Sequence, residues 1–360
     1  VLGYSIFFTS ILTLLSPLAA EKHYILFVVC RAFEGLFEGV AFPAMHGMIA
    51  RWLPKHERGL MSTIIYSGAA IGTVVTMAVA GVLSDSSFLG GWPSIFYVSG
   101  SVGVLWFLGW MFLIYDSPQQ HPSISGNELK TILEGQGEQR AHRNVVTPWK
   151  SILTSVPVWA LVIAHFGQNW GFYTLLFQLP TYFDTILGFN IKENGFLSAI
   201  PYLAQAVCGW IVSYILDSLI KRNVMKVNSV RKLSNTISTL GPAICLLAVT
   251  FAKCDSTLNV ILLTLAMAIN GFYYSGFNVT HVDMSPDFAG SLMGLTNCVA
   301  NFAGILAPYV VGALTASEPS LLNWSYVFYI STAIYIASAA IFLMFGSAEL
   351  QPWGIAKDCD

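Results

Sequence analysis

Long apolar runs follow one another along almost the whole chain, and each has about the length of a membrane-spanning helix. A helix needs about 20 apolar residues to cross the hydrocarbon core of a bilayer. Ten runs reach this length, and they predict helices at 2–20, 24–50, 60–83, 94–115, 156–183, 194–219, 236–252, 258–279, 290–314 and 326–346. The runs are too long for strands and lack the alternation of a membrane β-barrel. The sequence therefore predicts an all-α polytopic membrane protein.

The composition agrees with this fold class and excludes several functions. Charged residues make up 10% of the chain, whereas a soluble domain carries about 25%. The formal net charge of −2 gives no basic surface for nucleic acid. The six cysteines lack the spacing of a metal site or a disulfide framework, and no glycine-rich phosphate loop or activated nucleophile is present. We therefore predict no metal, no cofactor and no enzymatic activity.

Loop charges and loop lengths predict the orientation and the domain organisation. The loops after the second, fourth and sixth runs hold twelve Lys and Arg residues, against three in the opposite loops. Because positive loops stay in the cytoplasm, both ends of this chain are expected there. A polar loop at 116–153, with a helix-capping pattern at 125–128, separates four helices in 1–115 from six in 154–347, and 348–360 form a tail. Many carriers have two six-helix halves, so two further helices are expected to precede this sequence.

The second apolar run carries charges that a membrane helix rarely tolerates. Arg31, Glu34 and Glu38 fall within an arc of about 60° on one helix face, and His46 follows after Pro43, which is expected to bend the axis. Intramembrane charges almost always face a protein interior or a wet cavity. An arginine among carboxylates can hold an anion when a carboxylate is protonated, so we predict that Arg31 binds substrate and that Glu34, Glu38 and His46 couple protons. A structural Arg–Glu pair and an interface histidine are the alternatives.

Polar side chains also interrupt the fifth, eighth and ninth runs. Those predicted to contribute to substrate binding are Gln168, Asn169, Tyr173, Asn297 and Asn301. Those predicted to line a cavity or form a gate are His165, His281 and Asp283. For the four amides Gln168, Asn169, Asn297 and Asn301, hydrogen bonding between helices is the alternative interpretation. For His281 and Asp283, at the cytoplasmic end of their helix, the expected gate is a salt-bridged one.

Several of these segments resemble one known family. The run RAFEGLFEGVAFPAMH at 31–46, the pattern W-x-P-x-x-E-R at 52–58, and the segments NGFLSAIPY at 194–202 and GSLMGLTN at 290–297 are similar to the anion–cation symporter family of the major facilitator superfamily, in its sialin and sodium–phosphate cotransporter-like branch. The resemblance implies a major facilitator fold of twelve helices, ten of them in this sequence.

The resemblance also implies roles for individual residues. Arg31 and Glu38 match family positions needed for transport, Glu34 matches a carboxylate implicated in proton coupling, and His46 matches a histidine important for function. The vesicular glutamate branch has an arginine at the position of Gln168, which argues against glutamate as the principal substrate.

Three functional hypotheses follow. The first is a secondary transporter that exports sialic acid or a similar acidic sugar with protons, from a lysosome or vesicle. The second is a sodium-dependent cotransporter of phosphate or organic anions at the plasma membrane. The third belongs to another class, a transporter-like membrane receptor that no longer transports.

Overall fold

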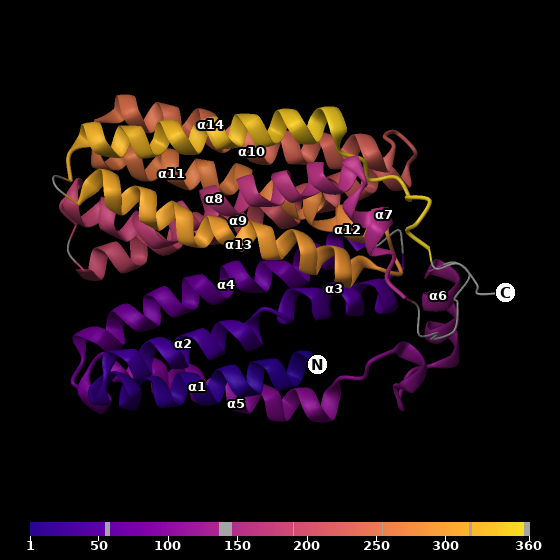
Figure 1. Ribbon diagram of the computed structural model, residues 1–360, viewed down its shortest axis with the longest axis horizontal. Coiled ribbons are helices and arrows are strands. Elements are labelled where there is room, and N and C mark those ends of the chain that lie inside the picture. The colour runs from indigo at the N-terminus through magenta and orange to yellow at the C-terminus, as the bar shows by residue number, and fades with distance from the viewer. Residues whose placement is uncertain (55–57, 137–145, 190, 254, 317–318, 356–360) are drawn as a thin grey trace. The chain divides into compact units, whose positions relative to one another are not determined.

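The computed structural model describes residues 1–54, 58–136, 146–189, 191–253, 255–316 and 319–355 (Figure 1). Within these ranges the chain is helical and contains no strand. The longer helices are α1 (Leu2–Lys22), α2 (Tyr24–Glu38), α3 (Ala41–Trp52), α4 (Arg58–Asp85), α5 (Pro93–Leu113), α6 (Gly126–Gln136), α8 (Val156–Thr185), α9 (Ile191–Lys221), α10 (Val227–Ala252), α11 (Ser256–Asn270), α12 (Phe277–Met284), α13 (Ala289–Thr315) and α14 (Leu321–Phe345). The shorter ones are α7 (Trp149–Leu153) and the 3-10 turns η1 (Phe88–Gly90), η2 (Pro118–Gln120) and η3 (Gly271–Ser275).

The all-α membrane architecture predicted from the apolar runs is confirmed. Eight helical segments among the described residues are long and apolar enough to cross a membrane, judged by length and composition. Helix α8 is longer still, at 30 residues, but it is interrupted by polar side chains and is not one of the eight. The number of ten spanning helices stays a prediction.

The second predicted span is divided into α2 and α3. Helix α2 ends at Glu38, and α3 begins after Val40, whose carbonyl accepts a hydrogen bond from Ala44 N at 3.0 Å. Pro43 has no backbone N–H to donate to the carbonyl of Gly39 four residues earlier, and its ring clashes with that carbonyl. The bend expected at Pro43 therefore appears one turn before it, and it leaves Glu38 at a helix end.

The chain forms two compact units. The first comprises 1–55, 79–143 and 289–294, and the second comprises 56–78, 144–288 and 295–360. In the first unit α1 packs against α2 and α5. The domain boundaries expected on either side of 116–153 stay a prediction.

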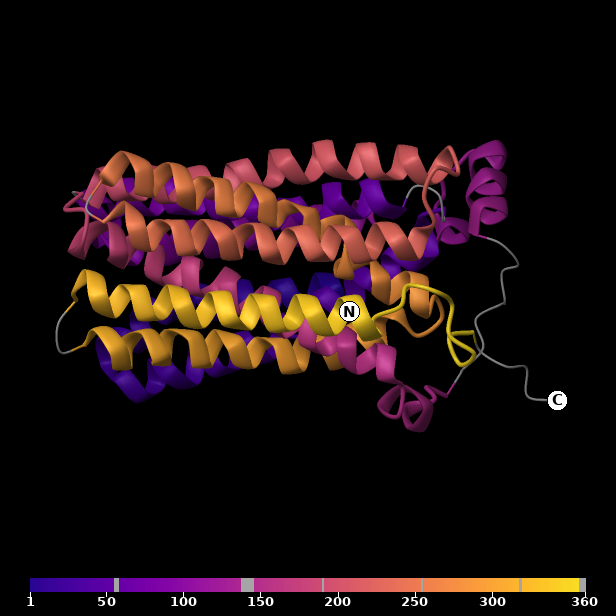
Figure 2. The same ribbon diagram turned by 90° about the horizontal axis from the view of Figure 1, so that it is seen from above.

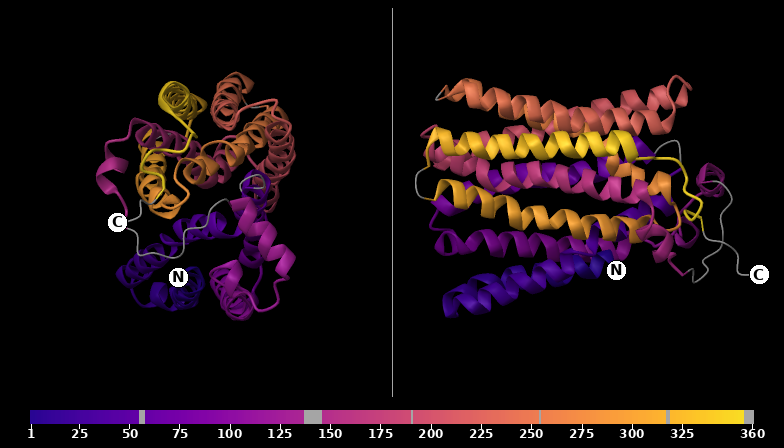
Figure 3. Two further views of the ribbon diagram at one scale, coloured as in Figure 1. Left: turned by 90° about the vertical axis from the view of Figure 1, so that its right-hand side faces the viewer. Right: turned by 45° about the horizontal axis from the view of Figure 1, so that its top comes forward.

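The second unit contains the larger core. Helix α10 packs against α11 and α14, α8 packs against α14, and α9 packs against α11, as the ribbon views show from different sides (Figures 1, 2 and 3). Fully buried aromatic side chains fill this core, among them Tyr182, Phe183, Tyr202 and Trp324.

Large apolar side chains also point away from the protein. Phe112 of α5 is 80% exposed and Phe251 of α10 is 78% exposed. Several other large apolar side chains of α5 and α10 are exposed as well. These surfaces suit contact with lipid, where apolar side chains lose nothing by facing outward.

The segment after α5 contains the short helix predicted there. Helix α6 starts as its capping pattern indicates, since Glu128 N donates to Ser125 Oγ at 3.1 Å. Residues 137–145 of the predicted loop and 356–360 of the predicted tail lie outside the described residues.

Candidate functional site

The first unit holds the predicted charged face of α2. The Arg31 guanidinium donates to the Glu34 carboxylate, one turn later on the same helix. The Arg31 side chain is 44% exposed, and it lies over the rings of Phe27 and Phe96 with its central carbon 5.4 and 5.1 Å from their centroids. Such cation–π contacts are attractive and leave the edge donors of the guanidinium available for other partners.

Glu34 is tied to the neighbouring helix as well as to Arg31. Only 4% of Glu34 is exposed, and its Oε1 accepts a hydrogen bond from Ser16 Oγ of α1 at 3.2 Å. Cys30, one turn earlier, donates from Sγ to the Leu12 carbonyl at 3.3 Å. Glu34 therefore links α2 to α1 by a hydrogen bond and also forms an ion pair with Arg31.

Glu38 and His46 lie in different surroundings from Glu34. Glu38 is exposed and ends α2, one turn beyond Glu34. His46 is 1% exposed on α3, and its Nδ1 lies 3.1 Å from the Phe42 carbonyl. A carbonyl only accepts, so this contact requires a proton on Nδ1.

In the second unit, the predicted residues of α8 and α12 meet on α13. The Thr296 hydroxyl lies 3.1 Å from His165 Nδ1 and 2.7 Å from His281 Nε2. His281 Nδ1 also approaches the Asn278 carbonyl at 3.2 Å, which makes Nδ1 the donor and Nε2 the acceptor in the neutral ring. Thr296 therefore donates to His281 and accepts from His165.

Gln168 belongs to a separate amide cluster, and the remaining predicted residues lie on exposed or half-buried surface. Gln168 Nε2 donates to Asn270 Oδ1 at 2.7 Å, and Gln205 Nε2 donates to the same oxygen at 2.7 Å. Tyr173 donates to Asn301 Oδ1 at 2.7 Å, and Asn301 Nδ2 donates to the Asn297 carbonyl at 2.9 Å. Asn169, beside Gln168, is half-buried.

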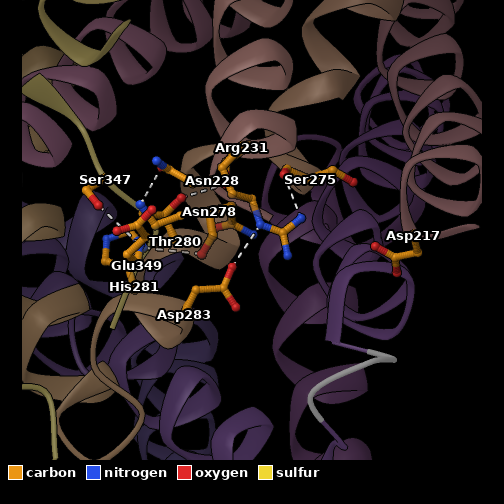
Figure 4. Close-up of polar contacts among 12 residues, drawn as sticks. Asp217, Asn228, Arg231, Ser275, Asn278, Thr280, His281, Asp283, Ser347 and Glu349 are labelled. Atoms are coloured by element: carbon orange, nitrogen blue, oxygen red, sulfur yellow. Dashed lines mark hydrogen bonds and ion pairs between the residues drawn. The ribbon is translucent and has the colours of Figure 1, made fainter. Parts of the chain in front are cut away.

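Asp283 forms an ion pair with Arg231 of α10. Arg231 Nε donates to Asp283 Oδ2 at 2.8 Å, and its Nη1 donates to the Ser275 carbonyl at 3.0 Å (Figure 4). Arg231 is 4% exposed. The sequence places this arginine in a loop, whereas α10 begins at Val227 and carries it inside the helix.

Comparison with known proteins agrees with the helical architecture. Residues 1–308 match the Major Facilitator Superfamily. The chain belongs to this superfamily. Human sialin is 41% identical over 354 residues, covering 98% of this chain and 70% of sialin. A putative inorganic phosphate cotransporter of Drosophila ananassae is 39% identical over 356 residues, covering 98% of this chain and 74% of that protein.

A solved structure supports the same fold for this major facilitator chain. A proton:xylose symporter has a TM-score of 0.70 and 14% sequence identity, over 97% of this chain and 82% of that one. The relatives place the chain in the anion–cation symporter branch, as the sequence motifs predict. The chain is therefore a multi-pass transporter of the sialin and phosphate-cotransporter type, and its family and relatives are not enzymes.

The sequence did not reveal several residues that complete these contacts. They are Ser16, Gln205, Arg231, Asn270 and Thr296. Each lies in or beside an apolar run. A polar residue at such a position is a signal that the sequence offers. Its hydrogen-bond partner cannot be predicted in the same way, because the partner depends on which helices pack together.

Proposed function

We propose that this transporter exports a small organic anion, sialic acid or a similar acidic sugar, together with protons. The observation that carries the proposal is the Arg31 guanidinium, which is half exposed, lies over two aromatic rings and pairs with Glu34, with Glu38 one turn away. Charged groups on an apolar helix are costly and mark substrate or proton pathways in membrane proteins. The likeness to sialin supports the choice of substrate class.

The chemistry couples the proton to the anion through competition for Arg31. While the carboxylates are ionised, Glu34 holds the guanidinium. Protonation removes that attraction, so Arg31 can bind the carboxylate of the substrate. Glu38 is exposed and Glu34 is buried, and both carboxylates are proposed to take up the proton. Proton and anion then leave on the opposite side by alternating access.

Other polar residues are proposed to contribute to the same pathway. Gln168, Asn169, Tyr173, Asn297 and Asn301 would contact the substrate, His46 would relay protons, and His165, His281 and Asp283 would line or gate the pathway. Export from an acidic organelle suits this direction of coupling, with both ends of the chain in the cytoplasm.

The experiment uses the full-length protein in liposomes with labelled sialic acid, phosphate and glutamate. A pH gradient is imposed with and without sodium. Acid-driven sialic acid flux that disappears in Glu38→Gln supports the proposal. Glu134→Gln is the matched control, because Glu134 is an exposed carboxylate of α6 whose side chain is 67% accessible. Flux that survives in Glu38→Gln as fully as in the control would remove the coupling role.

Sodium-dependent phosphate cotransport is the second candidate. The specific observation in its favour is the 39% identity to a putative inorganic phosphate cotransporter. In the same liposomes it predicts phosphate flux that requires sodium and is indifferent to the pH gradient. That result would replace the proton-coupled proposal.

A further inference from the structure

Three amide side chains meet in the interior of the second unit. Gln168 comes from α8, Gln205 from α9 and Asn270 from the end of α11, and their exposed fractions are 3%, 0% and 1%. Both glutamines donate to Asn270 Oδ1, each at 2.7 Å. None of the hydrogen bonds found within this amide cluster involves a charged residue.

The orientation of the three amides is fixed by one backbone contact. Asn270 Nδ2 donates to the Ser238 carbonyl of α10 at 3.2 Å. A carbonyl can only accept, so Asn270 must present its NH₂ to Ser238 and its oxygen to the glutamines. Each glutamine must then turn its own NH₂ toward Asn270. Exchanging N and O in either glutamine would place two carbonyl oxygens against each other.

This orientation leaves two acceptors without a partner. Gln168 Oε1 and Gln205 Oε1 are buried and accept no hydrogen bond from the described part of the chain. The Tyr202 hydroxyl, one turn before Gln205 on α9, is buried and unpartnered in the same way. A desolvated carbonyl oxygen without a donor is unfavourable, and a half-satisfied network stabilises a core less well than apolar side chains. The two oxygens are therefore available to accept hydrogen bonds from a bound molecule.

We propose that the amide cluster of Gln168, Gln205 and Asn270 binds the uncharged, hydrogen-bond-donating part of the transported anion, its hydroxyl or amide N–H groups. The inference rests on the proposed function, the transport of a small organic anion. Two carbonyl oxygens attract an O–H or N–H donor and repel a carboxylate or a deprotonated phosphate oxygen. The cluster therefore selects a polyhydroxylated or amide-bearing monocarboxylate over a dicarboxylate.

The test measures equilibrium binding separately from transport. Full-length protein in nanodiscs is titrated with sialic acid and with deoxy analogues that each have one hydroxyl replaced by hydrogen. In the unchanged protein, at least one analogue should bind about three- to tenfold more weakly, the size expected for one neutral hydrogen bond. In Gln205→Met, the affinity for sialic acid should fall to that of the analogue, while the affinity for the analogue should change little.

A matched variant controls for the chemical change itself. Gln178→Met makes the same substitution at a half-buried position of α8, and it should keep the preference of the unchanged protein. Because the result is a ratio of two ligands on one preparation, it does not depend on how much of a variant folds. The analogue series on the unchanged protein needs no variant at all.

Three outcomes would overturn the inference. The first is that sialic acid and all its deoxy analogues bind the unchanged protein equally well. The second is that Gln205→Met prefers sialic acid over the analogue as strongly as Gln178→Met does, which would mean that the oxygens bind an internal water molecule. The third is sodium-dependent binding whose sodium affinity shifts in Gln205→Met, which would assign the oxygens to a cation. Absence of acid-driven flux in liposomes, with the binding preference intact, would refute the proposed coupling and leave this recognition site standing.

Discussion

The buried ion pair of Arg231 and Asp283 gives a quantitative prediction. Replacing Asp283 with Asn removes the charge opposite a guanidinium that is only 4% exposed. The bond to the Ser275 carbonyl at 3.0 Å remains, but it does not neutralise the arginine. Removing one partner of a buried pair costs about 3–5 kcal/mol. Because the Asp283 side chain is itself 15% exposed, water offsets part of the loss and the lower end, about 3 kcal/mol, is expected.

This cost corresponds to a measurable shift in thermal unfolding. For a unit of this size, 1 kcal/mol lowers the midpoint by about 2–4 °C, so Asp283→Asn should lower it by about 6–12 °C. The assay is thermal unfolding of the purified protein in detergent, at constant lipid and salt. Glu349→Gln is the control, because it removes one carboxylate from an exposed position after α14, and it should shift the midpoint by less than about 2 °C.

A double variant separates the unpaired charge from other effects. Arg231→Met combined with Asp283→Leu removes both charges and leaves apolar side chains of similar size. Because replacing a whole buried pair is often neutral, it should recover most of the lost stability. If Asp283→Asn unfolds within about 2 °C of the unchanged protein, or if the double variant is as unstable as the single one, the charge argument is wrong.

Two further predictions concern close contacts in the same unit. In Gly271→Ala the new Cβ would lie 2.6 Å from the Gln205 backbone carbonyl oxygen, so we expect the free energy of unfolding, measured by thermal unfolding, to fall by about 1–3 kcal/mol. The control Gly72→Ala places its Cβ where no atom lies within 4 Å, so its stability should be nearly unchanged. Equal destabilisation by the two substitutions would contradict the packing argument. Thr296→Val keeps the side-chain shape but removes the hydroxyl between the two histidines, so it should lower the free energy of unfolding by about 1–3 kcal/mol. Thr296→Ser keeps the hydroxyl and should lower it by less. Equal stability of the two variants would exclude a stabilising hydroxyl bridge between the histidines.

The sequence predicts the helices well because apolar run length is a local property. The capping pattern at 125–128 and the disturbance around Pro43 are also local, and both have the expected effects on α6 and on the start of α3. The position of the second effect differs by one turn, because proline removes a hydrogen bond to the residue four positions earlier.

The contacts of the candidate site could be predicted only in part. Arg31 and Glu34 are three residues apart on one helix, so their pairing follows from helical periodicity. Gln205 and Asn270 are 65 residues apart, and nothing in either run indicates the other. Arg231 was misplaced for a different reason, because a charged residue at the edge of an apolar run is predicted to lie in a loop rather than in the helix. Its buried partner becomes evident only when α10 and α12 are packed together.

The glycines at the contact of α9 with η3 have a consequence for motion. Gly209 and Gly271 allow the two backbones to approach so closely that a Cβ on Gly271 would lie 3.0 Å from Gly209 N. Backbones in such contact interlock, and sliding one past the other would first require them to separate. Helix α9 and the end of α11 should therefore move as one rigid body during the transport cycle. Gln205 and Asn270 lie within a turn of this joint, so the spacing of the amide cluster is expected to survive the change between inward and outward states.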